Sequence, residues 1–220
     1  MIGPLPLYLS TELVANNTSP AVRLGTTITP EDAMTATATA PQTTTWTIDP
    51  AHTAVEFSAK HMMITTVRGR IADIRGTITV NEKNPALSSI EVELGAKSLN
   101  TGVEQRDQHL HSADFLDAEQ FPAISFKSRH IAGARAEEGA RFKVTGDLTI
   151  RGTTREVTLD TTYEGRGKDP WGGERLSFNA TTKIDRRDFG LTWNQALEAG
   201  GILVSNDIKL TIDAQAVLAK

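Results

Sequence analysis

The sequence predicts an all-β fold, an antiparallel barrel of about eight strands with one short helical insertion. Apolar and polar residues alternate in one segment after another between about Val55 and Ala216, most clearly in 90–94 and 208–213. A period of two places every apolar side chain of a strand on one face of the sheet. Many such strands in a short domain must roll up to bury that face, and closing the sheet also removes its exposed edges.

The alternating segments set the order of the expected strands. Trp46 and Ile48 predict a short first strand, which ends at a turn in 49–50. The alternation changes phase between Ile71 and Ile74, as it would at an inserted bulge residue. The other segments that alternate are 55–59, 67–80, 90–96, 124–126, 142–150, 157–163, 176–184 and 208–216.

Some segments depart from the alternation. Residues 103–117 are polar and charged, and their few apolar positions predict a short helix followed by one or two turns. A hairpin turn is expected at 151–152, and loops are expected at 165–173 and 195–201, where glycines are frequent. No sequence repeat of fixed length occurs, so a propeller or a solenoid is not expected.

The composition narrows the classes of function. The chain has 220 residues, a formal net charge of −4 and no cysteine. It contains no basic run and no aromatic residues interleaved with basic ones, which argues against a nucleic-acid partner. Without cysteine there is no disulfide, thiol nucleophile or thiolate metal site. No apolar run approaches the ~20 residues that a membrane-spanning helix needs.

The first 44 residues differ in composition from the rest. They are rich in Thr, Ala and Pro and poor in charge, which is typical of a disordered or loosely attached tail. The lipid-binding barrel domain is then expected over 45–220, and Met34 is an alternative natural start. The apolar stretch 1–9 lacks the basic residues that open a secretory signal and contains prolines. A cytoplasmic location is therefore expected, with a secreted or periplasmic one as the alternative.

The interior of the barrel is the predicted functional site, because eight strands can enclose one small ligand. Aromatic residues make up only 5% of the chain, so slim side chains would line one narrow, elongated tunnel. Such a tunnel suits a flexible aliphatic chain better than a flat cofactor. The alternative is a filled core, and the protein would then be an interaction domain. The side chains expected to line the tunnel are Phe57, Ile78, Val92, Leu94, Phe126, Phe142, Val144, Leu148, Phe178, Leu191 and Ile208.

A set of motifs occurs in a characteristic order along the chain. They are WTIDPAHT at 46–53, FSAKHMMI with VRG from 57 to 69, RDQHLHSADFLD with FP and SF from 106 to 126, GDLTIRG at 146–152 and DRRDFGL at 185–191. Together they resemble the YceI-like family of lipocalin-like proteins, which bind polyisoprenoids. The similarity extends over about 45–216.

The resemblance implies an extended, eight-stranded antiparallel lipocalin-like barrel with a small helix. It also implies ligands that are long isoprenoid chains, including prenyl quinones and prenyl phosphates, or fatty amides, and it suggests a homodimer. The expected function is that of a carrier, not an enzyme, which holds such a lipid in the barrel lumen without a cofactor. Members of the family are often secreted or periplasmic, whereas this chain shows no clear signal.

Three arginines are candidates for binding the polar end of the ligand. Arg106, in the expected helix, would lie at the barrel mouth and bind a phosphate through two parallel hydrogen bonds. Arg186 and Arg187, beside an expected bend at 189–193, are equally candidates or structural side chains. No paired-carboxylate, Ser–His–Asp or phosphate-loop motif occurs in the sequence.

The alternative function is a metal-dependent enzyme on the same barrel. Its candidate ligands are His52, His61, His109, His111 and Asp114. Against it, His109 and His111 are two residues apart and would point ~200° away from each other on a helix. The competing interpretation is that these side chains cap the helix and bond the loop backbone.

Overall fold

The computed structural model describes residues 43–198 and 200–219, which form one antiparallel sheet that closes on itself. The strands are β1 (Thr43–Ile48), β2 (Ala54–His61), β3 (Thr65–Ile71), β4 (Ile74–Asn81), β5 (Ser89–Gly95), β6 (Leu99–Asn100), β7 (Ala123–Ala132), β8 (Arg141–Ile150), β9 (Thr153–Lys168), β10 (Glu174–Asp185) and β11 (Val204–Leu218). The α-helix is α1 (Glu104–His111), and the 3₁₀ helices are η1 (Pro50–His52), η2 (Pro85–Leu87), η3 (Ala96–Ser98) and η4 (Arg186–Phe189). Of the predicted tail, 1–42 lies outside the described residues, and β1 begins at Thr43.

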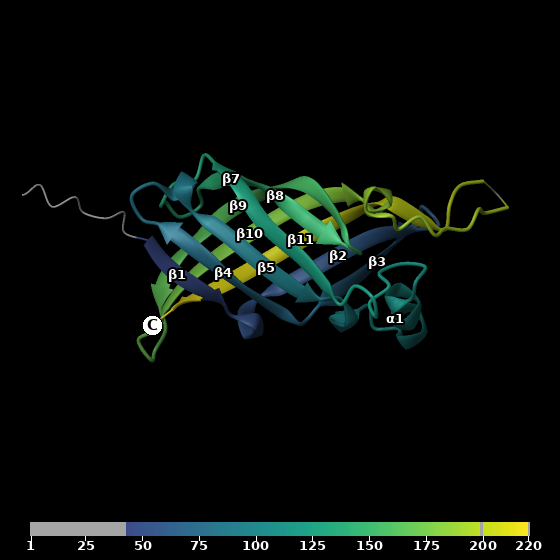
Figure 1. Cartoon of the computed structure of the whole chain (residues 1–220), viewed down its shortest axis with the longest axis horizontal. Coiled ribbons are helices and arrows are strands. Elements are labelled where there is room, and N and C mark those ends of the chain that lie inside the picture. The colour runs from purple at the N-terminus through teal and green to yellow at the C-terminus, as the bar shows by residue number, and fades with distance from the viewer. Residues whose placement is uncertain (1–42, 199, 220) are drawn as a thin grey trace, which may run out of the picture. The chain divides into compact units, whose positions relative to one another are not determined.

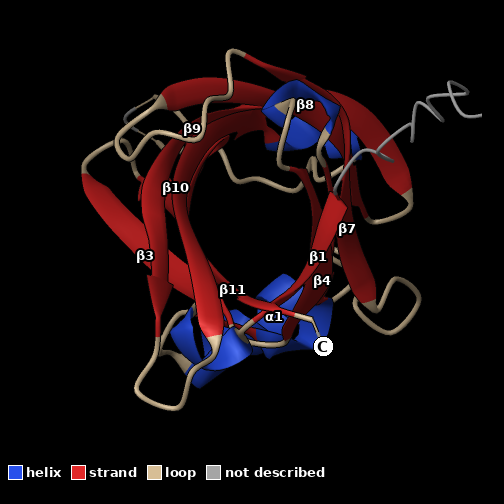
Figure 2. Ribbon diagram, turned by 90° about the vertical axis from the view of Figure 1, so that its left-hand side faces the viewer, coloured by secondary structure: helices blue, strands red, loops and turns tan. Residues whose placement is uncertain are grey.

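A closed ring of strands surrounds the interior (Figure 2). The ring runs β1-β4-β5-β7-β8-β9-β10-β11, and the pairing of β1 with β11 closes it. Strands β2, β3 and β6 continue the wall towards α1: β2 pairs with β11 and β3, and β3 pairs with β6. The predicted eight-stranded antiparallel barrel with a short helix is confirmed.

The breaks between β1 and β2 and between β3 and β4 have local causes. Pro50, which has no N–H, begins η1, and the Asp49 carboxylate accepts the Ala51 N–H at 3.0 Å. At 72–73, both backbone N–H groups donate to the Ser98 hydroxyl, at 3.1 and 2.9 Å, and not to a neighbouring strand. The expected single strand with a bulge over 67–80 is therefore corrected, because the chain forms two strands here that pair with different neighbours.

Two strands are longer than the alternation predicts. β9 continues into the expected loop at 165–173, because Gly165 (φ 127°) accommodates a bulge and Arg166 then pairs with Glu174 across the strands at 2.5 Å. β11 begins at Val204, before the first residue of the predicted strand. Its register with β2 is irregular there, and this irregularity hides the alternation.

The apolar interior consists of two clusters along the barrel axis. One surrounds Trp46, which is 0% exposed, and lies at the end where β1 starts and β11 finishes, here called the β1 end. The other surrounds Phe115 and Phe189 at the opposite end, here called the α1 end (Figure 1). Leu94 packs against both clusters. Apolar side chains therefore line the interior from one end of the barrel to the other.

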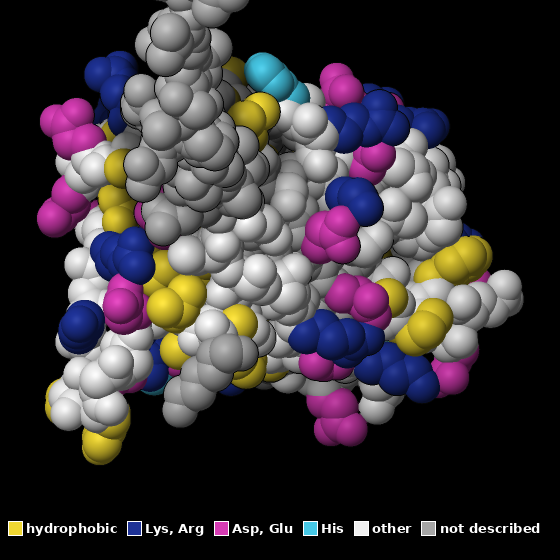
Figure 3. Space-filling model, turned by 60° about the vertical axis from the view of Figure 1, so that its left-hand side comes forward, with side chains coloured by type: hydrophobic (Ala, Val, Ile, Leu, Met, Phe, Trp, Pro, Cys, Tyr) yellow, Lys and Arg dark blue, Asp and Glu magenta, His cyan; other side chains and the backbone are white. Residues whose placement is uncertain are grey.

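On the side of the molecule that Figure 3 shows, positive and negative side chains are interspersed and hydrophobic ones lie in small separate groups. Many of the charges pair across neighbouring strands, as Lys143 does with Asp160 at 2.5 Å and Arg129 with Asp147 at 2.7 Å. Within 43–198 and 200–219, no helix is long and apolar enough to cross a membrane. The alternation therefore separates an apolar lumen from a hydrated outer wall.

Candidate ligand-binding site

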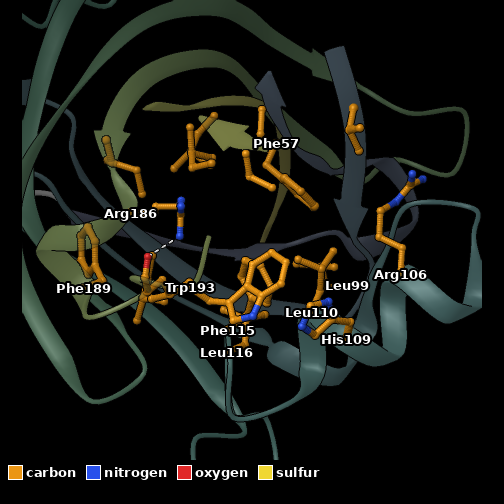
Figure 4. A pocket seen from close by; sticks show the side chains of 18 of the residues that line it. Phe57, Leu99, Arg106, His109, Leu110, Phe115, Leu116, Arg186, Phe189 and Trp193 are labelled. Atoms are coloured by element: carbon orange, nitrogen blue, oxygen red, sulfur yellow. Dashed lines mark hydrogen bonds between the residues drawn. The ribbon is translucent and has the colours of Figure 1, made fainter. Parts of the chain in front are cut away.

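The first internal cavity, cavity 1, lies at the α1 end of the barrel and has a volume of about 280 Å³. Strands β2, β3, β10 and β11 contribute to its wall, and α1 and the loop that follows η4 contribute to its cover (Figure 4). The wall is built from inward positions of the strands, which the alternation makes apolar. Its lining includes Phe57, Ile71, Leu110, Leu191, Ile208 and Leu210.

An aromatic group holds the cover of cavity 1 together. The ring of Trp193, from the loop after η4, lies 4.6 Å from His109 of α1 and 5.2 Å from Phe115. His109 also packs edge-on against Phe115 at 5.0 Å, and its Nε2 lies 2.9 Å from the Asp114 carboxylate. Two segments far apart in the sequence are therefore joined by ring contacts. Trp193 is not among the predicted lining residues, although it lies within the bend predicted at 189–193.

Arg106 lies at the edge of cavity 1, on α1, with its guanidinium held by the chain (Figure 4). Its Nε donates to the Thr101 hydroxyl at 2.7 Å, and a terminal nitrogen donates to the Thr101 carbonyl at 3.0 Å. The buried carboxylate of Asp107 accepts the Thr101 N–H at 2.8 Å. These bonds fasten α1 to the end of β6. The role of Arg106 in binding a ligand stays a prediction.

Arg186 is the buried cation of cavity 1. It is 3% exposed, and its guanidinium extends towards the space between Phe57 and Trp193 (Figure 4). Its Nε donates to the Ser205 carbonyl at 3.1 Å, and one terminal nitrogen donates to the Leu191 carbonyl at 2.5 Å.

The Arg186 guanidinium has few polar partners among the described residues. Its second terminal nitrogen has only a long contact, 3.4 Å, to the Asn206 side-chain oxygen. Among the described residues, Arg186 takes part in no ion pair, because the carboxylate of Asp185 pairs with Arg187. Burial lowers the pKa of the Arg186 guanidinium from its ordinary value, and a buried cation without a counter-ion is costly.

The structure separates two arginines that the sequence analysis ranked alike. Arg187 is exposed and donates to the Asp185 carboxylate at 2.5 Å. The hydrogen bonds from Arg187 lower the pKa of Asp185 to about 2. A signal for the buried position of Arg186 exists in the sequence, because it continues the inward alternation of β10 after Thr182 and Ile184.

Among the described residues, the ionisable side chains that line cavity 1 include no carboxylate. All of them are lysine, arginine or histidine, and no aspartate or glutamate is among the described residues that line it. The five are Lys60, His61, Arg106, His109 and Arg186. An apolar cavity with a polar lining of this kind is complementary to an anionic amphiphile.

The second internal cavity, cavity 2, lies at the β1 end and has a volume of about 350 Å³. Phe178 packs against Tyr163 at 5.4 Å and against Phe142 at 6.3 Å, and these rings form part of its wall. Burial raises the pKa of the Tyr163 phenol. The charged side chains here are mixed in sign: Arg166 pairs with Glu82 at 3.2 Å and stacks over the Trp46 ring at 4.9 Å.

The predicted lining residues divide between the two cavities and the wall between them. Phe57, Leu191, Ile208 and Arg106 line cavity 1. Ile78, Phe142 and Phe178 line cavity 2. Neither cavity is lined by the remaining five, which are Val92, Leu94, Phe126, Val144 and Leu148. As the pairing registers show, these five also belong to the inward rows of the barrel.

One row of paired residues lies on the wall between the cavities, here called the waist: Gly76, Val92, Phe126 and Leu148. The pairing register places this row between Ile78, which lines cavity 2, and Ile124, which lines cavity 1. The two cavities have no lining residue in common. The two cavities lie in line along the barrel, with this row on the wall between them, and the expectation of one elongated tunnel stays a prediction.

The histidines of the alternative, metal-dependent function do not form a metal site. His52 pairs with Asp49 at 2.9 Å on η1, and His111 lies 3.0 Å from the Leu99 carbonyl. His61 and His109 both line cavity 1. In the part of the chain that the structure describes, no group of three or more His, Cys, Asp or Glu side chains is placed to hold a metal ion.

A closed antiparallel barrel with apolar cavities inside it is the architecture of proteins that enclose a small apolar ligand. The model of the YceI-like domain matches residues 46–216. The chain therefore belongs to the YceI-like family.

Individual relatives support this placement. Protein YceI of Salmonella newport is 35% identical over 169 residues, which is 77% of this chain and 83% of the relative. The crystal structure of the Campylobacter jejuni YCEI protein superimposes with a TM-score of 0.62 at 29% identity, and the match covers 73% of this chain and 90% of that one. A polyisoprenoid binding domain from Saccharophagus degradans has a TM-score of 0.61 at 10% identity, over 79% of this chain and 98% of that one.

Proposed function

We propose that this protein is a binding protein that carries a long-chain isoprenoid in its barrel lumen. The observation that supports the proposal most strongly is the pair of apolar cavities in line inside a closed barrel. The Saccharophagus degradans domain, which binds polyisoprenoids, has the same fold. Apolar surface removed from water contributes ~25 cal/mol per Å², before the entropy costs of binding. A long prenyl tail has an apolar surface of roughly several hundred Å², so burial of the tail supplies the affinity.

The waist favours a linear ligand over a compact one. A ligand that fills both cavities must pass along the wall that carries Val92 and Phe126, which are neighbouring, partly buried side chains of β5 and β7. A thin flexible chain needs only rotamer changes there, whereas a bulky ring system needs the strands to separate. The waist therefore favours a ligand with a thin, flexible hydrocarbon chain.

The polar lining supports a head group with negative charge. Arg186 is buried without a carboxylate, and cavity 1 is lined by no acidic side chain of the described residues. An anionic head group would supply the missing counter-charge through hydrogen bonds to an ionised donor, which are stronger than neutral ones. Of the two expected ligand types, a prenyl phosphate fits this cavity better than a prenyl quinone.

The lumen is tested by placing a charge inside it. Phe178→Asp and Phe126→Asp are expected to abolish retention of a polyprenyl phosphate, because each buries a carboxylate against the tail. The matched controls, Ser177→Asp and Ser125→Asp, put the same charge on the outer face of the same strands and are expected to keep binding. Organic extraction of the protein from its own host, followed by mass spectrometry, identifies the native lipid. Unchanged retention in folded Phe178→Asp and Phe126→Asp proteins would rule out the lumen as the site.

The head-group assignment is tested at Arg186 with two ligands of the same tail. Arg186→Gln is expected to lower the affinity for a polyprenyl phosphate about ten-fold or more, as loss of a charge-assisted contact does. Its affinity for the neutral polyprenol should change little, and Arg186→Lys should restore part of the difference. An equal loss for both ligands would show that Arg186 only supports the loop after η4.

A further inference from the structure

The tip of the β2–β3 hairpin is apolar, exposed and next to cavity 1. Met62, Met63 and Ile64 are 43%, 60% and 75% exposed. His61, at the base of the tip, lines cavity 1, and the Met62 N–H donates to the carbonyl of Leu203, another lining residue, at 2.7 Å. We propose that this tip docks the protein on an anionic phospholipid membrane and so places cavity 1 at the bilayer surface. The proposal rests on the proposed lipid-carrying function.

The backbone of the tip is strained for the residues it contains. The Ile64 N–H donates to the His61 carbonyl at 3.1 Å and closes a turn. Its two central residues, Met62 and Met63, have φ of 51° and 60°, which is the left-handed region that Asn and Gly adopt most readily. Two bulky apolar side chains thus occupy positions where Asn-Gly would be more stable. Strain of this kind is kept where another demand outweighs stability, and insertion into lipid is such a demand.

The charges beside the tip fit a membrane with anionic lipids. Lys60 on β2, which also borders cavity 1, and Arg68 on β3 are exposed, and their cross-strand partners, Thr66 and Ser58, are uncharged. Neither cation takes part in an ion pair among the residues that the structure describes. The loop before β11, which contacts the tip through Leu203, carries one acidic residue, Glu198. An apolar tip flanked by free cations is the pattern of interfacial membrane anchors.

The size and chemistry of the tip favour lipid over a protein partner. Three consecutive side chains on a projecting turn offer a small convex surface, whereas a stable protein interface needs a broad one. Methionine is unbranched and polarisable, so it adapts to a disordered environment such as acyl chains. The hairpin continues directly into the wall of cavity 1, so a docked tip gives the cavity a route to lipid in the bilayer.

The full chain is tested by co-sedimentation with phosphatidylcholine vesicles that contain or lack phosphatidylserine. The wild type is expected to bind the anionic vesicles and to be released by high salt. Met63→Ser/Ile64→Ser should weaken binding about ten-fold or more, because it removes the inserted apolar surface. Trp171→Ser is the matched control: Trp171 is 88% exposed at the β9–β10 turn of the opposite end, and its loss should leave binding unchanged.

A second variant separates docking from folding. Met62→Asn/Met63→Gly supplies the residues that the turn prefers, so it should raise the melting temperature while it weakens vesicle binding. Its equilibrium affinity for a polyprenyl phosphate in solution should stay at the wild-type value, and transfer of that lipid to vesicles should slow. The proposal would be overturned if both hairpin variants bound vesicles as the wild type does, or if Trp171→Ser lost as much binding as they do. It would also be overturned if the wild type did not bind vesicles. Loss of solution affinity in the hairpin variants would assign the tip to the cavity itself, whereas failure of the wild type to bind polyprenyl phosphate at all would overturn the proposed function separately.

Discussion

Arg186 and Arg187 are adjacent in the sequence, but their side chains have different environments and different roles. Arg187 is exposed and shares its charge with Asp185, whose side chain also caps η4 by accepting the Arg187 N–H at 2.9 Å. Arg186 points the other way and is buried among carbonyl groups in an apolar cavity. The first arrangement stabilises a turn. The second places a cation where a ligand can reach it.

The lowered pKa of Asp185 predicts how the stability of the protein depends on pH. The pKa of Asp185 is about 2, below its ordinary value of 3.8, because the ionised form accepts hydrogen bonds from Arg187. Its contribution to the free energy of unfolding is therefore present above about pH 3.8 and is lost as the pH falls through about 2. Asp185→Asn should lower stability by about 1 kcal/mol at neutral pH, since both partners are partly hydrated, and this difference should shrink as the pH falls towards about 2.

Urea unfolding at neutral and acid pH measures this difference. The control is Asp188→Asn, which removes a neighbouring carboxylate that makes no ion pair within the described chain. A gap between wild type and Asp185→Asn that is the same at every pH would contradict the assignment.

At the scale of the elements, the barrel depends on strands that bend and break at defined places. β1 with β2, and β3 with β4, are pairs of strands with a short break between them, and the long β11 pairs with both β1 and β2. Close approach of the strands requires glycine at Gly76, where a Cβ would lie 2.4 Å from the Glu91 carbonyl oxygen and 2.9 Å from the Val92 Cα of the paired strand. Those contacts are with backbone, which cannot rotate away.

Gly76→Ala should therefore destabilise the barrel by about 1–3 kcal/mol through overpacking. Gly167→Ala is the matched control, because a Cβ at Gly167 of β9 would meet nothing within 4 Å; its effect should stay within about 0.5 kcal/mol. Urea unfolding of the two variants beside the wild type gives both values. Equal stability of the two variants would show that β4 moves aside and that the close approach at Gly76 is not needed.

At the scale of the whole molecule, the lumen is two cavities and a waist, with different chemistry at each end. Cavity 1 has only basic residues and histidines among its polar side chains, whereas cavity 2 has Glu82 together with Arg135 and Arg166. If the proposed function holds, we expect this asymmetry to orient a bound amphiphile, with its anionic head at the α1 end and its tail towards the β1 end.

The waist predicts selection by chain length. Phe126→Trp enlarges a waist side chain and should lower the affinity for a long polyprenyl phosphate about ten-fold. Farnesyl phosphate, which is short enough for cavity 1 alone, should bind as it does to the wild type. Fluorescence or calorimetric titration of both ligands measures the ratio, with Ser125→Trp on the outer face of β7 as the control. An equal loss for both ligands would mean that the tail does not pass the waist.

Much of this architecture could be predicted from the sequence, and the parts that could not have a common cause. The order of the strands along the chain, a short helix within 103–117 and the hairpin at 151–152 follow from short-range patterns. The change of phase at 71–74 was predicted as a bulge in one strand, but it is a break between β3 and β4. The end of β9 and the start of β11 were missed because bulges shift the alternation there. The predicted inward residues do lie on the inward rows, but which of them border a void depends on neighbours from distant strands.

The sequence by itself determined which side chains face the lumen and that the lumen is apolar, because the alternation of a strand is a local property with a period of two. Only the tertiary structure decided that Val92 and Phe126 lie side by side on the wall between the two cavities, that Trp193 meets His109 over cavity 1, and that Arg186 is buried with no ion pair among the described residues. Each of these depends on distances between segments that the chain brings together only when the barrel closes. Packing of that kind is set by the sum of many non-local contacts, so no single stretch of the sequence contains it.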